Sequence, residues 1–313
     1  MGSLYGFEVK SELPLSRLNS AAGTRGELRI ETGIRAPDLD GRQPTTRLTG
    51  EDGRLHYASY ELGSRHLLRL PPSGDFLLEP ETARIGVFAA DEDDELREHR
   101  IASAAACTLL SAKGDLALHA AAIEAEGTAV VFCGPTQRGK STLVRALGEA
   151  GHPVLGEDGV VLVLDEDGAT AHPGARGVRV RGAAAEDSHV VELLPDPGPR
   201  EPATCATAAM LVLDARGERL EVDALEPARA LALLASHLVH SGGREALAAA
   251  FGRLARLLAA VPAFRVSLPD DLAALPEAAV AMLDAVGLPT RLVGHAYASA
   301  VQPKGERDAR DEQ

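Results

Sequence analysis

The chain has 313 residues, of which 45% are hydrophobic and 25% are charged, as is usual for folded proteins, and this excludes a wholly disordered chain. Its formal net charge of −14 excludes a protein that mainly binds a nucleic acid backbone, because such binding requires Lys and Arg to neutralise phosphates. Three cysteines without metal-ligand spacing, and the lack of a signal-peptide or membrane-spanning pattern, indicate a cytoplasmic protein without a membrane partner.

Residues 1–90 contain short strand-like runs separated by Gly, Pro and Asp, which predicts a small, mainly antiparallel β lobe. The polar stretch 36–47 predicts a loop within this lobe. A helix over 91–115 should follow, because five acidic residues precede apolar positions at helical spacing: Ile101, Ala104, Ala105, Leu109 and Leu110. We expect this helix to link the β lobe to a second domain at 116–301.

The second domain opens with the apolar run TAVVFC, the glycine-containing run GPTQRGKS at 134–141, and a helical pattern that ends at Gly151. Strand, glycine loop and helix in this order are the context of a P-loop. Apolar runs then predict two hairpins, one at 159–172 and one at 208–225. Helices at 227–240, 244–261 and 277–286, with a strand at 263–268, complete a mixed α/β (α+β) domain. The charged segment 302–313 is expected to be a disordered tail.

The run GPTQRGKS matches GxxxxGK[ST], in which each conserved position has a physical role. Gly134 and Gly139 allow the backbone N–H groups to point at phosphate oxygens, and the next helix adds its positive end. Lys140 reaches the β and γ phosphates, and the Ser141 hydroxyl can bind Mg²⁺. Arg138 either contacts a phosphate or is a solvated loop residue. The predicted nucleotide-binding residues are Gly134, Pro135, Thr136, Gln137, Arg138, Gly139, Lys140, Ser141 and Thr142.

An acidic partner for the metal is also needed, and the sequence offers several candidates. Asp165 and Asp214 follow apolar runs at predicted turns, where an Asp usually stabilises the turn itself. Glu157 and Asp158 instead lie inside the strand-like run VLGEDGVVLV, where buried carboxylates need a cation partner. We therefore expect the pair to be functional. His119, in LALHAAAI, is either a core histidine or a site residue.

These residues together resemble the catalytic domain of the HPr kinase/phosphorylase family, a P-loop fold related to phosphoenolpyruvate carboxykinase. The resemblance lies in spacing as well as residue type over about 116–160. The matching features are His119, Gly134–Ser141, Ala150-Gly151-His152 and Glu157-Asp158. The phrases YGFEVKSELPLSRL and VPAFRVSLPDDLAALPE resemble shorter kinase homologues, some of which phosphorylate lasso-peptide precursors on serine.

The resemblance implies that Asp158 takes the proton of a serine hydroxyl, with His119 orienting it and Lys140 binding phosphate. Ser141, Glu157 and Asp158 would lie at the Mg²⁺ ion, and ATP would be the phosphate donor. The family proper has an Asp-Asp pair and a later Glu-containing motif. Here Glu157 comes first and only ARGVRVRG occurs at 175–182, where Arg179 is a weak substitute, so a phosphorylase activity does not follow.

The sequence thus predicts an ATP- and Mg²⁺-dependent serine kinase that acts on a protein or a ribosomally made, lasso-type precursor peptide. Two alternatives stay open, a small-molecule kinase and a nucleotide-binding switch without transfer activity. The resemblance also leaves open a homo-oligomer. Gly242-Gly243-Arg244 is either helix punctuation or a mobile loop near the nucleotide.

Overall fold

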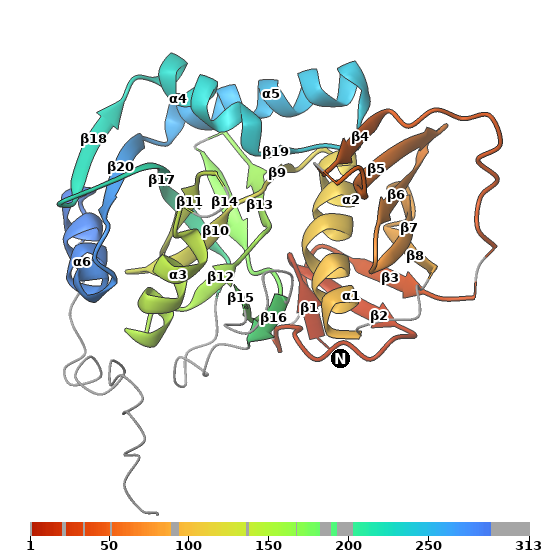
Figure 1. Cartoon of the computed structure of the whole chain (residues 1–313), viewed down its shortest axis with the longest axis horizontal. Helices are drawn as coiled ribbons and strands as arrows, with labels where there is room; N and C mark the ends of the chain where they lie inside the picture. Colours follow the sequence, from red (N-terminus) through yellow and green to blue (C-terminus); the bar gives the residue numbers. More distant parts are fainter. Residues whose placement is uncertain are drawn as a thin grey trace, which may run out of the picture.

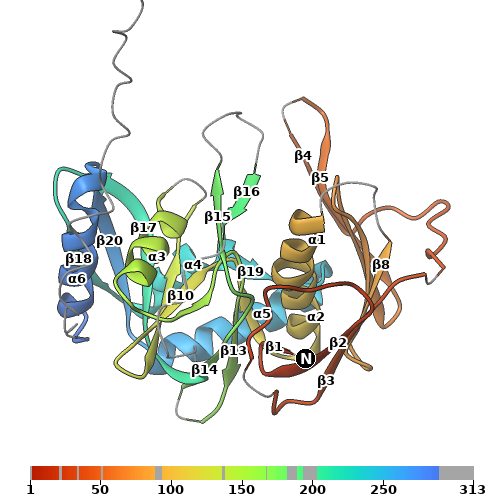
Figure 2. The ribbon, with the colours of Figure 1, turned by 90° about the horizontal axis from the view of Figure 1, so that it is seen from below.

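The computed structural model describes residues 2–20, 23–33, 35–50, 52–88, 94–135, 138–166, 168–181, 189–192 and 203–288. It is a mixed α/β structure with two large sheets (Figures 1 and 2). The predicted tail at 302–313 lies outside the described residues. Within them, no helix combines the length and apolarity needed to cross a membrane.

The first sheet has eight strands in the order β1-β2-β3-β8-β7-β6-β5-β4. It is mainly antiparallel, as expected, although β3 runs parallel to both of its neighbours, β2 and β8. The edge strand β4 begins in the predicted loop; all four of its residues are exposed, so no apolar alternation marks it. The strands are β1 (Gly2–Leu4), β2 (Phe7–Ser11), β3 (Glu27–Glu31), β4 (Thr46–Thr49), β5 (Leu55–Leu62), β6 (Arg65–Leu70), β7 (Gly74–Glu79) and β8 (Arg84–Phe88).

A long helix follows the first sheet and lies between the two sheets (Figures 1 and 2). It consists of α1 (Asp94–Arg100), a π-helical segment η1 (Ile101–Ala105) and α2 (Ala106–Lys113). Leu109 shares one core with Leu68 and Phe76 of the first sheet, so the helix covers that sheet. It ends at Gly114, whose φ of 112° is the left-handed conformation that terminates many helices.

The second sheet has ten strands, and its centre is parallel. β11 (Thr128–Cys133), β17 (Cys205–Gly217) and β20 (Ala263–Pro269) run side by side in the same direction. Their carboxyl ends therefore meet at one edge, the usual position of ligand sites in such sheets. The other strands are β9 (Leu116–Leu118), β10 (Ala121–Ala125), β12 (Val154–Gly156), β13 (Val160–Leu164), β14 (Ala169–His172), β18 (Glu221–Leu225) and β19 (Leu238–Val239). β15 (Val178–Arg181) and β16 (His189–Glu192) form a separate pair.

Helices cover both faces of the second sheet. α3 (Lys140–Glu149) and α6 (Leu275–Ala285) share a core with Phe132 and Leu211 on one face. α4 (Pro227–Leu234) and α5 (Gly243–Ala260) pack with Val131 and Met210 on the other. The residues of β11 and β17 are thus buried on both faces, which explains why both strands read as continuous apolar runs. Two short 3₁₀ turns, η2 (Ala235–His237) and η3 (Leu272–Ala274), complete the elements.

The predicted hairpin at 208–225 and the predicted length of the helix at 227–240 are wrong. The hairpin at 208–225 does not form, because β20 lies between β17 and β18 and pairs with both. The helix at 227–240 ends at Leu234, since Leu238 and Val239 pair with β9 instead. In both places a strand distant in sequence supplies the hydrogen bonds. The predicted hairpin of β13 and β14 is confirmed.

Candidate functional site

The glycine turn joins the end of β11 to the start of α3, as the sequence predicts. Gly134 and Gly139 have φ angles of 155° and 92°, which favour glycine. A Cβ atom on Gly134 would lie 2.3 Å from the carbonyl oxygen of Leu213 in the neighbouring strand. The turn can therefore lie this close to β17 only because residue 134 has no side chain. Thr136 and Gln137 lie outside the described residues.

Lys140 is the first residue of α3, and its side chain is folded back into the turn. Its Nζ donates hydrogen bonds to the carbonyl oxygens of Gly134 (2.6 Å) and Pro135 (3.2 Å). Burial lowers the pKa of the ammonium group, while Asp158, Cys133 and Glu157 act in the opposite direction. Arg138 and Thr142, also predicted to bind nucleotide, are exposed on either side of this lysine.

Glu157 and Asp158 lie on a turn, so the prediction that they sit inside a strand is wrong. β12 ends at Gly156 and β13 begins at Val160. Asp158 has a φ of 64°, in the left-handed region that Asp tolerates better than most residues. The flanking Gly156 and Gly159 bring the two ends of the turn close together: a Cβ on Gly156 would lie 2.6 Å from the Gly159 carbonyl oxygen. The turn directs the two carboxylates to different partners.

The Glu157 side chain contacts the start of α3. The Ser141 hydroxyl donates a hydrogen bond to Glu157 Oε1 at 2.6 Å. A hydroxyl and a carboxylate oxygen side by side are ligands that suit Mg²⁺, which usually takes one or two protein carboxylates and completes its shell with phosphate and water. Among the described residues there is no cluster of three or more His, Cys, Asp or Glu that could hold a metal. The Ser141 hydroxyl and the Glu157 carboxylate are the side chains at this turn that could hold a divalent metal ion.

The Asp158 carboxylate lies between two histidines. Its Oδ1 is 3.3 Å from His119 Nδ1, and its Oδ2 is 3.1 Å from His99 Nε2. Burial would raise the pKa of Asp158, but the hydrogen bond from His99 and the charges of His119 and Arg100 outweigh it and hold this pKa well below its usual range. Asp158 is thus a carboxylate that stays ionised. An ionised carboxylate only accepts hydrogen bonds, so His99 Nε2 carries the proton.

His119 is the more accessible of the two histidines, with a side chain 41% exposed, against 7% for His99. It lies in the connection between β9 and β10, and its backbone N–H donates to the carbonyl oxygen of His237 at 2.7 Å. The side of Asp158 that faces His119 is therefore the side from which a second molecule can approach. The structure brings together His119, Lys140, Ser141, Glu157 and Asp158 from the predicted site.

Two residues near the site were not predicted, His99 and Arg216. His99 precedes Asp158 by 59 residues and sits in a charged helical segment, so no local pattern marks it. Arg216 lies near the carboxyl end of β17, and its Nη2 would be 2.6 Å from a Cβ on Gly139. The predicted hairpin at 208–225 placed residues 215–217 in its turn, and nothing in that prediction brought Arg216 next to Gly139.

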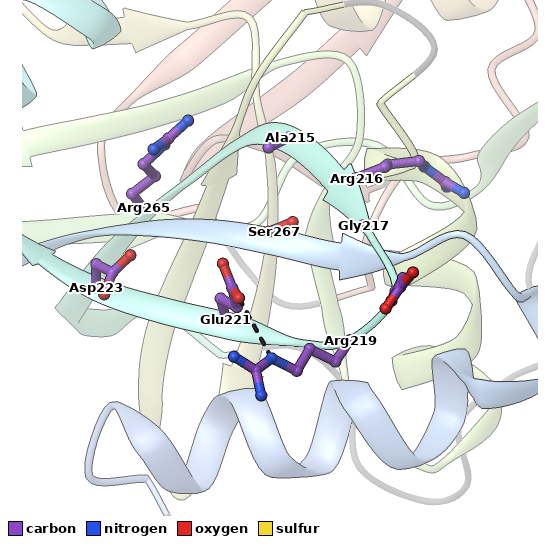
Figure 3. A pocket seen from close by; sticks show the side chains of 9 residues that line it. Ala215, Arg216, Gly217, Arg219, Glu221, Asp223, Arg265 and Ser267 are labelled. Atoms are coloured by element: carbon purple, nitrogen blue, oxygen red, sulfur yellow. Dashed lines mark hydrogen bonds and ion pairs between the residues drawn. The ribbon is translucent and has the colours of Figure 1, made fainter.

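Figure 3 shows the hollow at this end of β17, with Arg216 pointing away from Asp223 and Arg265. The volume of this hollow is about 510 Å³. Its charged lining is balanced, with three arginines and three acidic residues: Arg216, Arg219, Arg265, Glu218, Glu221 and Asp223. Balanced charge does not favour an anionic ligand, so the hollow itself is not a second phosphate site. Arg216 is the lining residue whose guanidinium lies next to Gly139 of the glycine turn.

The other candidates do not join the site. The prediction that Asp214 lies at a turn is wrong, because Asp214 lies within β17. Its two carboxylate oxygens accept hydrogen bonds from Arg265 Nε, at 2.9 and 3.0 Å. Asp165 does lie at a turn, where its N–H donates to the Gly168 carbonyl at 3.2 Å. Gly242 immediately precedes α5, and Gly243 is its first residue, so these glycines mark the start of a helix. Arg244 lies in the first turn of α5. Arg179 belongs to β15.

Comparisons with known proteins find only a distant structural relation. No family model and no curated protein matches this chain. Among solved structures, the HPr(Ser) kinase/phosphatase from Coxiella burnetii matches with a TM-score of 0.35 and 11% identity, over 55% of this chain and 96% of that chain. A relation this distant assigns no residue, so a function has to be argued from the side-chain geometry.

Proposed function

We propose that this protein is an ATP- and Mg²⁺-dependent kinase that phosphorylates serine in a protein or peptide. One observation carries the proposal. Glu157 contacts Ser141 at the start of the glycine turn helix, and the next residue, Asp158, is an ionised carboxylate held next to His119. A phosphate-binding turn, a magnesium-binding pair and a proton acceptor thus occur within one site, which is what phosphoryl transfer requires.

The donor nucleotide would bind with its phosphates in the turn between Gly134 and Ser141. The backbone N–H groups at the start of α3 and the Lys140 ammonium would hold the β and γ phosphates. Arg216, beside Gly139, adds a second cation. Ser141 and Glu157 would hold Mg²⁺, which neutralises phosphate charge when bound.

Asp158 would receive the acceptor hydroxyl on its His119 side. In the transfer the serine oxygen forms a bond to the γ phosphorus, the bond between that phosphorus and the bridging oxygen breaks, and ADP leaves. The hydroxyl proton passes to Asp158 and then to solvent. Because the pKa of Asp158 is low, its main contribution is to orient the hydroxyl, and it takes the proton late in a loose transition state.

The acceptor class comes from the resemblance at His119, Gly134–Ser141 and Glu157-Asp158. The lasso-type precursor peptide comes from the phrases YGFEVKSELPLSRL and VPAFRVSLPDDLAALPE, and the cytoplasmic setting from the cysteine pattern and the lack of a signal-peptide pattern. The test begins with titration calorimetry of MgATP into the protein. It continues with transfer from radiolabelled ATP to a degenerate library of serine-containing peptides, with a panel of hydroxylated metabolites as the comparison. Transfer to peptides supports the proposal. Transfer to a metabolite alone identifies a small-molecule kinase, and binding without transfer identifies a switch.

A further inference from the structure

His99 lies outside the second domain but contacts its candidate catalytic carboxylate. It is near the end of α1, in the helix that covers the first sheet, and its side chain is 7% exposed. Its Nε2 is 3.1 Å from Asp158 Oδ2, while His119 contacts the other oxygen. With both oxygens fixed, the carboxylate has one orientation. Asp158 Oδ1, on the more exposed His119 side, is the oxygen that an acceptor hydroxyl would approach.

The helix changes form immediately after His99. The π-helical segment η1 spans Ile101–Ala105, and the Ser103 hydroxyl donates to the His99 carbonyl at 2.7 Å. In a regular α-helix, residues four apart point in directions that differ by ~40°. A π-helical turn contains more residues than an α-helical turn, so this angular difference becomes smaller. His99, Ser103 and Cys107 consequently face the same turn of the second domain. Single π turns inside helices are frequent at functional sites.

The turn that carries Asp158 packs tightly against this helix face. A Cβ on Gly159 would lie 2.7 Å from Cys107 Sγ and 3.3 Å from Ser103 Cα. A residue with a side chain at position 159 would therefore push the turn away from the helix. The absence of a side chain here is what brings the Asp158 carboxylate within reach of His99.

The first sheet also contacts the turn, through Tyr5. Its hydroxyl donates to the Gly159 carbonyl oxygen at 3.2 Å and lies 3.3 Å from Cys107 Sγ, which donates to it. Tyr5 is 1% exposed, so neither contact competes with solvent. The turn is thus fixed from the first sheet as well as from the helix.

These contacts explain how Asp158 keeps an unfavourable backbone conformation. A non-glycine residue with a φ of 64° is in a disfavoured conformation, and such residues persist where the surroundings hold them. We propose that His99 is a positioning residue that holds the Asp158 carboxylate for the transfer, so that the first sheet and its helix are part of the active site. This inference rests on the proposed kinase function.

The experiment compares two variants of the full-length protein, His99→Gln and His99→Leu. The Gln amide nitrogen can occupy the place of His Nε2 and donate to Asp158, whereas Leu cannot donate. Thr108→Ala is the matched control, because Thr108 is another buried polar residue of the same helix. Among the described contacts, its hydroxyl donates only to the Ala104 carbonyl. If His99→Leu does not fold, His99→Asn, with an amide too short to reach Asp158, replaces it.

Hydrogen exchange of the backbone amides at 156–160 gives a readout that needs no acceptor. We expect exchange at least tenfold faster in His99→Leu, and within threefold of wild type in His99→Gln and Thr108→Ala. With the peptide library, kcat should fall at least tenfold in His99→Leu, with the KM for MgATP unchanged, and should recover in His99→Gln. The inference is overturned if the amides at 156–160 exchange in His99→Leu at the wild-type rate. It is also overturned if exchange is accelerated equally in His99→Leu, His99→Gln and Thr108→Ala.

Failure of the kinase proposal gives a different result. In that case the wild-type protein transfers no phosphate to any peptide, while the exchange comparison still decides whether His99 holds the turn. A kinase whose kcat is unchanged in His99→Leu retains the proposed function and rejects the role of His99.

Discussion

The Ser141 hydroxyl donates a hydrogen bond to Glu157 Oε1 across 2.6 Å, and this contact joins the glycine turn to the acidic turn. Without it the two motifs would be separate features of the chain, 16 residues apart. With it, the glycine turn and the carboxylate pair lie together at the edge of the second sheet. The order of the pair then matters: Glu157 faces Ser141, and Asp158 faces the histidines.

Asp158→Asn should separate transfer from nucleotide binding. The amide keeps the size of the carboxylate but accepts protons poorly, so transfer to the peptide library should fall about 100-fold or more. The dissociation constant for MgATP should stay within about threefold of wild type, because the phosphate contacts come from the glycine turn. Asp165→Asn, an exposed turn residue, is the control and should leave both values unchanged. An active Asp158→Asn enzyme would exclude Asp158 as the proton acceptor.

Glu157→Gln should change the magnesium dependence. Replacing a charged ligand with a neutral amide should raise the Mg²⁺ concentration for half-maximal activity about tenfold, since Mg²⁺ prefers carboxylate oxygen. The measurement is activity at fixed ATP across a Mg²⁺ titration. Glu149→Gln is the control, because Glu149 lies at the other end of α3 and pairs only with the exposed Arg145 among the described ion pairs. The same magnesium curve in Glu157→Gln and wild type would remove Glu157 from the metal site.

The elements could be predicted from the sequence where the pattern is local. The strand TAVVFC and the helix after it follow from burial and amphipathic spacing, and the glycine turn follows from their junction. The turn at Glu157 and Asp158 was missed because VLGEDGVVLV reads as one apolar run. Its glycines allow a tight turn, but contacts with residues distant in sequence hold it, including those of Asp158 with His99 and of Gly159 with Tyr5.

The pairing of distant segments could not be predicted. β20 lies between β17 and β18 and pairs with both, and nothing near residue 215 encodes this. The contact of His99 with Asp158 also depends on how the linking helix packs on the second domain. A single sequence shows which residues can do chemistry, but it does not show which residues from another domain hold them in place.

Stability should decrease below neutral pH because of two buried histidines. Burial lowers the pKa of His172 to about 4, helped by the charge of Arg25, and burial lowers that of His237 to about 4, helped by Lys140 and His119. In the unfolded chain a histidine has a pKa of ~6.5. Between about pH 4 and this value, the unfolded chain therefore binds more protons than the folded protein. The free energy of unfolding is therefore highest above about pH 6.5 and falls as the pH decreases toward 4.

Urea denaturation at pH 7.5, 6 and 5 measures how the free energy of unfolding changes with pH. The variant His172→Asn isolates the contribution of His172 to this change. The Asn amide can replace His172 Nδ1 as the partner of the Thr204 hydroxyl, 3.3 Å away, without titrating. We expect the loss between pH 7.5 and 5 to shrink by about 1 kcal/mol in this variant. An unchanged slope would mean that His172 does not contribute.

Gly134→Ala should destabilise the protein much more than Gly151→Ala. Both glycines have positive φ angles, of 155° and 96°, so both substitutions strain the backbone. A Cβ on Gly134 would meet the Leu213 carbonyl at 2.3 Å, whereas one on Gly151 would meet nothing within 4 Å. The difference in the free energy of unfolding should be about 2 kcal/mol or more, as for an overpacked core. Equal costs would show that the turn moves away from β17 without penalty.

Arg216→Ala tests whether the guanidinium group beside Gly139 binds phosphate. Its Nη2 would lie 2.6 Å from a Cβ on Gly139, and its buried Nε has no hydrogen-bond partner among the described residues. A nucleotide phosphate would satisfy this group, so the variant should bind MgATP about tenfold more weakly than wild type, with a smaller loss for AMP. Arg219→Ala, which removes an exposed arginine of the same hollow paired with Glu221, should leave both affinities unchanged. If Arg216→Ala binds MgATP as wild type does, the arginine instead supports the glycine turn from outside, and Lys140 with the backbone N–H groups accounts for phosphate binding.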